Sequence, residues 1–209
     1  MKMRVPRPRL RAGVIAAALT ISAAVVGISA PTGFAQAPNA QPAVPNDIRV
    51  PDGNKLFLVR HAVGTQDYVC VPSGGDFKFV LVTPRATLLS DEDHPAAAHY
   101  FSPNPFEGGT IRATWDESGE AGIVWGQAVQ SSTDSDFVAP GAIGWVLLRA
   151  VGAENGTGGD ESLTATTYIQ RLNTVGGQAP STGCNSTTDV GNQAFVPYVA
   201  DYLFYESDA

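Results

Sequence analysis

The feature that most constrains this chain is a succession of short strand-like runs separated by turn-forming residues. Residues 77–83 (FKFVLVT) alternate at their start, which places Phe77, Phe79 and Leu81 on one face of a strand. Residues 143–151 (IGWVLLRAV) are nearly all apolar, as expected of a strand covered on both faces. Further strand-like runs occupy residues 55–63, 66–71, 86–89, 97–101, 110–115, 122–129, 168–177 and 195–205.

No stretch combines a helical apolar period with capping residues, so the chain is predicted to be all-β with little helix. Gly64 and Thr65 predict a turn between the first two runs. Antiparallel strands at this spacing form either a sandwich or a barrel. Of the two, we expect an antiparallel β-sandwich with jelly-roll or Greek-key-like connections.

Residues 1–35 have the layout of a secretory signal peptide. Residues 1–11 hold five basic and no acidic side chains, an uncharged and mostly apolar run spans 12–28, and the small residues Gly33 and Ala35 favour cleavage after Ala35. Cleavage after Ala37 and an uncleaved membrane anchor are the alternatives. The protein is therefore predicted to be secreted, either extracellular or at the cell surface. A flexible lead-in at 36–47 and a single β domain at 48–209 would follow.

Export changes the net charge, because all 20 acidic residues follow position 35 while five of the 13 basic residues precede it. The chain after cleavage carries a charge of 8 − 20 = −12. Phosphate backbones and anionic lipids repel such a polyanion. The charge therefore argues against nucleic acid as a partner and, after cleavage, against a membrane. Solubility outside the cell explains the acidity most simply.

Two cysteines remain after cleavage, Cys70 and Cys184. In an exported chain a single pair usually closes as a disulfide, which would tie the early strands to the late ones. The two cysteines are 184 − 70 = 114 positions apart. Closing a loop of that length corresponds to about 4–5 kcal/mol of stabilisation in the chain-entropy model. A reactive thiol or a metal ligand is the alternative interpretation.

The three histidines, His61, His94 and His99, are the weak candidates for a catalytic or metal site. His94 lies among acidic residues, and His99 lies on a predicted strand. Their spacing fits no zinc motif, so we predict no metal and no cofactor. The chain also lacks a G-x-S-x-G elbow, a dinucleotide fingerprint and a phosphate-binding loop.

Charged residues interrupt three apolar strands at Arg149, Arg171 and Asp201. A buried charge is costly unless it is paired. We therefore expect Asp201 to form a structural ion pair with Arg171 or Arg149. A ligand-binding arginine is the alternative, because a guanidinium also recognises carboxylates and phosphates.

Aromatic residues are the candidates for a ligand-binding surface. Trp115, with Tyr100 and Phe106, could form an exposed platform for a sugar, although aromatic residues on strands more often fill a core. An exposed Trp115 would favour the first interpretation.

Several motifs occur in an order that resembles one family. They are GTQDYVC (64–70), TPRATLLSD (83–91), AHYFSP (98–103), AIGWVLLRAVG (142–152), TTYIQRLNTVGGQAPSTGC (166–184) and VPYVADYLFY (196–205). Together they resemble the domain-of-unknown-function family 3455, which is found in secreted bacterial and fungal proteins. The resemblance implies an exported, mostly β domain and supplies no established activity or catalytic set.

One position departs from the family pattern, because Phe106 stands where the family tends to carry a tryptophan. The aromatic ring is kept and the indole N–H donor is lost. Some relatives carry a dehydrogenase-type name, but this chain has neither a Rossmann signature nor an alternating β/α pattern.

Export, acidity and the lack of catalytic motifs favour a non-catalytic binding or structural protein of the cell exterior, with wall polysaccharide as a candidate partner. A secreted hydrolase or metal-dependent enzyme centred on His99 is the alternative. A third interpretation, a small-molecule carrier, requires an apolar cavity between the sheets.

Overall fold

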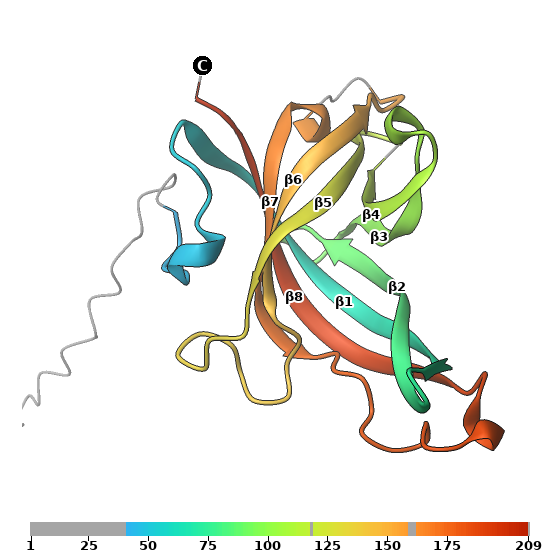
Figure 1. The fold of residues 1–209 in the computed structure, drawn as a ribbon. Coiled ribbons are helices and arrows are strands. Elements are labelled where there is room, and N and C mark those ends of the chain that lie inside the picture. Colours follow the sequence, from blue (N-terminus) through green and yellow to red (C-terminus); the bar gives the residue numbers. More distant parts are fainter. Residues whose placement is uncertain (1–40, 118, 159–161, 209) are drawn as a thin grey trace, which may run out of the picture. The chain divides into compact units, whose positions relative to one another are not determined.

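The computed structural model describes residues 41–117, 119–158 and 162–208, and the predicted signal peptide lies outside them. Eight antiparallel strands follow one another around a closed barrel, and the last strand pairs with the first (Figure 1). The strands are β1 (Asn54–Ser73), β2 (Asp76–Leu89), β3 (Pro95–Asn104), β4 (Thr110–Glu117), β5 (Gly122–Ser132), β6 (Trp145–Glu154), β7 (Thr166–Gly176) and β8 (Gln193–Ser207).

Helical structure in the described part of the chain consists of short 3-10 turns, as predicted. They are η1 (Asn46–Ile48), η2 (Pro105–Glu107), η3 (Ser162–Ala165) and η4 (Thr187–Asp189). No helix in this part of the chain has the length and apolarity needed to cross a membrane.

The prediction of a β-sandwich is wrong. β1 pairs with β2 on one side and with β8 on the other, from Asn54 opposite Ser207 to Val69 opposite Gln193, so that the sheet closes on itself. Side chains alternate between two faces in a sandwich and in a barrel alike. Closure depends instead on the stagger between neighbouring strands, which the alternation does not encode.

The predicted turn at Gly64 and Thr65 is also wrong, because β1 runs through both residues as one strand of 20 residues. A Cβ atom at position 64 would collide with the carbonyl oxygen of Arg85 on β2. Gly64 therefore lets β1 and β2 approach closely, which is a common reason for glycine inside a strand.

Side chains that point into the barrel form the first of two apolar clusters. One part of this interior is tightly packed by Leu88, Val124, Leu163, Ile169 and Phe204, all of them fully buried. Leu163 comes from η3, so a short helical turn contributes to the core between the strands.

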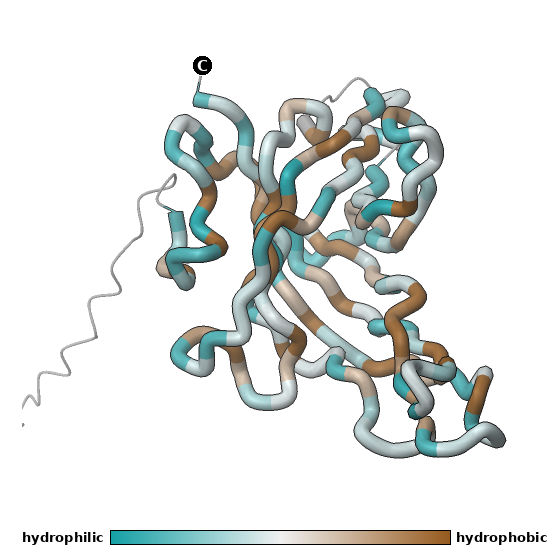
Figure 2. Tube along the Cα trace, in the orientation of Figure 1, coloured by the Kyte–Doolittle hydropathy of each residue, from teal (hydrophilic) through white to brown (hydrophobic). Residues whose placement is uncertain are grey.

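The second apolar cluster, called the outer cluster below, lies on the outer face of β6, β7 and β8. Its buried residues come from those strands, from the N-terminal segment and from the connection between β5 and β6, and they are Val44, Ile48, Val50, Val138, Ala142, Trp145, Leu147, Leu172, Leu203 and Tyr205. Both covering segments lie on the left of the barrel in Figure 1, and Figure 2 shows apolar residues in them and along the strands.

The first part of β6 is therefore covered on both faces, as its sequence predicted, whereas Arg149 further along the strand is exposed. Leu148 belongs to the interior cluster and its neighbour Leu147 to the outer cluster. The same division holds on β8, where Tyr202 and Phe204 point inward while Leu203 and Tyr205 point outward. The buried Val44 extends this packing into the predicted flexible lead-in.

The predicted disulfide is confirmed. Cys70 on β1 is bonded to Cys184 in the connection between β7 and β8, with 5.4 Å between their Cα atoms. Backbone hydrogen bonds between Cys70 and the turn at Gly191 and Asn192 support the same contact.

Candidate functional site

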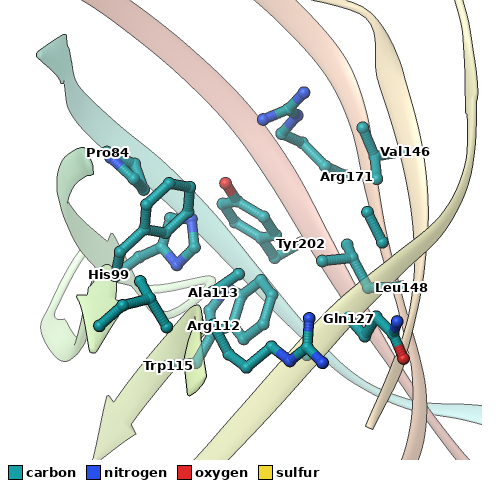
Figure 3. Close-up of a pocket in the computed structure, with 14 residues that line it drawn as sticks. Pro84, His99, Arg112, Ala113, Trp115, Gln127, Val146, Leu148, Arg171 and Tyr202 are labelled. Atoms are coloured by element: carbon teal, nitrogen blue, oxygen red, sulfur yellow. The ribbon is translucent and has the colours of Figure 1, made fainter. Parts of the chain in front are cut away.

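A cavity of about 250 Å³ occupies part of the barrel interior. Its lining comes from every strand except β1, and Figure 3 shows the lining side chains. Ile111, which is 57% exposed, and Ala128 are exposed parts of the lining, so they mark the mouth of the cavity. His99, Trp115 and Tyr202 are almost completely buried and form its floor.

The floor is built from stacked rings. His99 on β3 lies opposite Trp115 on β4 in the sheet register, and their rings stack with centroids 4.6 Å apart and planes 16° apart. Tyr202 from β8 is tilted against both, with centroid distances of 4.8 Å to His99 and 5.4 Å to Trp115. Gly126 on β5 leaves room for the indole, because a Cβ there would come within 2.8 Å of Trp115 Cζ3.

His99 is a neutral imidazole inside this stack. Its Nδ1 lies 2.8 Å from the carbonyl oxygen of Thr114, which makes Nδ1 the protonated nitrogen. Burial lowers the pKa of His99 to about 3, against the opposing effect of the Thr114 hydrogen bond and with a smaller contribution from the Arg171 charge. A histidine with this pKa is a poor general base near neutral pH.

Two arginines line the cavity and differ in their partners. Arg112 on β4 forms a bidentate ion pair with Glu107, with N–O distances of 2.7 and 2.9 Å. Arg171 on β7 donates from Nη2 to the carbonyl oxygen of Gly144 at 2.8 Å, while its buried Nε has no hydrogen-bond partner. None of the ion pairs between described residues involves Arg171.

Tyrosine hydroxyls lie beside Arg171 in the interior. Figure 3 shows Tyr202 between His99 and Arg171, with its hydroxyl on the side of the guanidinium. Burial raises the pKa of Tyr202 and of Tyr198, and the Arg171 charge partly opposes this effect at both. The two hydroxyls are 3.5 Å apart, and their raised pKa values keep both un-ionised at neutral pH.

The three histidines do not converge. His61 lies on the outer face of β1, where Nδ1 is 2.7 Å from Asp201 and Nε2 is 3.5 Å from Asp91. The hydrogen bond with Asp201 is the main cause that raises the pKa of His61. His94 is exposed in the connection between β2 and β3, whereas His99 is inside the barrel.

A metal ion would also lack a cluster of ligands, since no group of three or more His, Cys, Asp or Glu side chains gathers within the described ranges.

The structure does not form the predicted ion pair of Asp201 with an arginine. Adjacent residues of a strand point to opposite faces, so Asp201 faces outward next to the inward Tyr202 and accepts hydrogen bonds from His61 and Asn173. Arg171 points into the barrel, and Arg149 is exposed and donates to Gln127 at 3.3 Å. The spacing in sequence did not reveal that these side chains lie on different faces.

The expected aromatic platform is likewise absent from the surface at Trp115, whose exposed fraction is 0%. Tyr100 is half-buried and donates its hydroxyl to Asp116 at 2.6 Å. Phe106 is 58% exposed and packs edge-on against Trp125. The three residues therefore do not share one exposed surface.

Sequence reasoning did not single out Tyr202 or the small residues that leave the cavity open as parts of a site. Tyr198, Ala200, Tyr202 and Phe204 alternate along β8 and all point inward, which was the available signal for Tyr202. Ala113, Gly126 and Ala128 lie on neighbouring strands, but only the strand register brings them to one space.

Comparison with known proteins addresses the family. No curated protein and no solved structure matches the chain. The model of the family described as "Protein of unknown function (DUF3455)" matches residues 90–206, which are 117 of the 209 residues and include the floor of the cavity and Arg171. The resemblance found in the motifs is therefore confirmed, and the chain belongs to this family of proteins of unknown function.

Proposed function

We propose that the protein is an exported, non-catalytic binding protein that holds a small, largely apolar organic molecule inside the barrel. The observation that carries the proposal is the cavity of about 250 Å³ with its floor of stacked rings from His99, Trp115 and Tyr202. Eight-stranded barrels are just wide enough to hold one small ligand, and ligand sites are typically concave, apolar and furnished with a few polar groups.

The size of the cavity limits the ligand. A dry apolar cavity of about 150 Å³ is enough to bind benzene. The larger cavity here accommodates a single substituted ring or a short branched chain. A polysaccharide would need an exposed aromatic platform, and the burial of Trp115 therefore favours the small molecule over the sugar polymer.

The chemistry of the lining supports binding over catalysis. The described lining residues include no serine, threonine, cysteine, lysine, aspartate or glutamate that could serve as a nucleophile or carboxylate base. The one histidine is neutral with a pKa of about 3. Export rests on the layout of residues 1–35 and on the disulfide, which is typical of oxidising compartments.

The test is calorimetric titration of the purified protein with two neutral probes, benzamide and hexanamide. We expect saturable binding of at least one probe, and loss of that binding in Ala113→Leu, which fills the cavity. Ala128→Phe obstructs the exposed mouth and is expected to weaken binding with less risk to folding. Ala139→Leu makes the same kind of change at an exposed position outside the cavity and is expected to bind as the wild type does.

Circular dichroism and thermal unfolding check that each variant is folded. Binding of neither the neutral probes nor their carboxylate analogues by the wild type would contradict the proposal. Undiminished binding in a folded Ala113→Leu variant would place the ligand outside the barrel and contradict it as well.

A further inference from the structure

Arg171 is placed inside the barrel without a counter-charge. Its neighbours in the interior include Tyr198, Tyr202 and His99, whose pKa values its charge lowers, and none of them is an anion at neutral pH. The other cavity arginine, Arg112, is already engaged by Glu107. A partly buried charge without a partner is costly, and proteins retain such groups mainly where function uses them.

Unused hydrogen-bond donors accompany this charge. The buried Nε of Arg171 and the buried Nε1 of Trp115, both from residues that line the cavity, have no acceptor. Buried donors are almost always satisfied in native proteins, so these orphan donors mark Arg171 and Trp115 as lining residues whose polar groups the protein leaves partly unsatisfied.

An anionic oxygen is the acceptor that fits this arrangement best. A guanidinium donates two parallel N–H bonds to a carboxylate, and such charge-assisted bonds are roughly twice as strong as neutral ones. The apolar walls increase that strength, because they exclude water from the pair. The neutral His99 adds no second positive charge, so the cavity offers one full charge for one anionic group.

Resting on the proposed function, we propose that the ligand is a small organic monocarboxylate, either a one-ring aromatic acid or a short aliphatic acid, whose carboxylate binds Arg171. The Tyr202 hydroxyl lies on the guanidinium side of the cavity and is a second donor to the same group (Figure 3). The apolar body of the acid packs on the His99–Trp115 stack, toward the mouth at Ile111.

Isosteric probes test the charge separately from the shape. Benzoate is compared with benzamide, and hexanoate with hexanamide, by calorimetric titration at neutral pH. We expect the carboxylate of at least one pair to bind about tenfold or more tightly than its amide, since a hydrogen bond to a charged group contributes about 1.5–3 kcal/mol. Arg171→Gln is expected to remove that preference while the amide still binds.

Arg149→Gln is the matched control, because it removes one positive charge from β6 at an exposed position outside the cavity. It is expected to retain the preference for the carboxylate within about twofold, the size expected of a screened surface charge. Thermal unfolding of both variants verifies that they are folded.

The outcomes separate the two proposals. Binding of amide and carboxylate with equal affinity would overturn the monocarboxylate inference and leave the small-molecule cavity in place. A carboxylate preference that survives in folded Arg171→Gln would also overturn it. Binding of neither probe would contradict the proposed function itself.

Discussion

The outer cluster and the barrel interior differ in how their buried polar groups are satisfied, and two glutamines show the difference. Gln170, with an exposed fraction of 0%, lies in the outer cluster, donates to the Ile48 carbonyl at 2.7 Å and accepts from the Tyr205 hydroxyl at 2.6 Å. Gln66, with an exposed fraction of 1%, lies in the interior, and its amide nitrogen has no partner. Trp145 Nε1 is the exception in the outer cluster, since it is buried and unpaired.

The difference indicates two roles for the two faces of the same strands. The outer cluster joins the N-terminal segment to β6, β7 and β8. The buried side chain of Gln170 finds its hydrogen-bond partners within the chain itself. The interior combines a packed part with a cavity, and it contains buried donors without a partner and the Arg171 charge without a counter-charge. We infer that the outer cluster contributes stability and that, under the proposed function, the interior trades some stability for binding.

The largest expected effect is on packing. Leu172→Ala in the outer cluster should lower the free energy of unfolding by about 3–5 kcal/mol, whereas Leu148→Ala, which borders the cavity, should cost only about 2 kcal/mol. Leu148 already faces empty space and so loses fewer contacts. Urea unfolding of both variants measures the two costs, and equal costs would remove the distinction between the regions.

The two glutamines provide a matched pair. Gln170→Leu leaves the Ile48 carbonyl and the Tyr205 hydroxyl without the hydrogen bonds that they form with Gln170, and we expect a loss of about 2–3 kcal/mol. Gln66→Leu removes an amide nitrogen that had no partner, and we expect a loss of about 1 kcal/mol or less. A larger loss at Gln66 than at Gln170, again by urea unfolding, would contradict the comparison.

His99 makes the interior sensitive to acid. Its pKa is about 3 in the folded protein, against 6.5 for an ordinary histidine, so below pH 6.5 the unfolded chain binds a proton that the folded protein does not. Stability should therefore fall as the pH drops, with a limiting slope of about 1.4 kcal/mol per pH unit from this residue. In His99→Gln that contribution to the slope should disappear.

The slope of the unfolding free energy against pH is best measured, by urea unfolding, between pH 5 and 6.5. The raised pKa of His61 makes a contribution that is fully present below pH 6.5 and is lost only as the pH rises through its folded pKa. Glu107, whose pKa is lowered to about 2 chiefly by the hydrogen bond from Arg112, loses its contribution only as the pH falls below about 4.5. His94→Gln is the control, and an unchanged slope in His99→Gln would refute the prediction.

The smallest expected effect is a rise, rather than a fall, in the free energy of unfolding. Arg171→Met replaces an unpaired charge by an apolar chain of similar length, and we expect the unfolding free energy without ligand to rise by about 0.5–1 kcal/mol. Arg149→Met at the exposed control position should change it by less than about 0.5 kcal/mol. A loss of more than 1 kcal/mol in Arg171→Met would show that Arg171 has a structural role.

The sequence identified several residues of the cavity but assigned them separate roles. His99 was selected as a catalytic or metal candidate, Trp115 as an exposed platform and Arg171 as half of an ion pair with Asp201. All three line the same cavity, where Trp115 is buried rather than exposed and Arg171 is not paired with Asp201, whose partners are His61 and Asn173. Residue type marked them as unusual, but the partner of each was set by strand pairing, such as His99 opposite Trp115.

By itself, the sequence determined the all-β content, the disulfide between Cys70 and Cys184, the coverage of the first part of β6 on both faces and the family. These follow from local properties, namely residue alternation, turn chemistry, the number of cysteines and short motifs. The tertiary structure alone decided that the sheet closes into a barrel, that Asp201 and Arg171 face opposite sides and that a cavity remains. Those features depend on register and stagger between strands distant in sequence, which alternation along one strand leaves open.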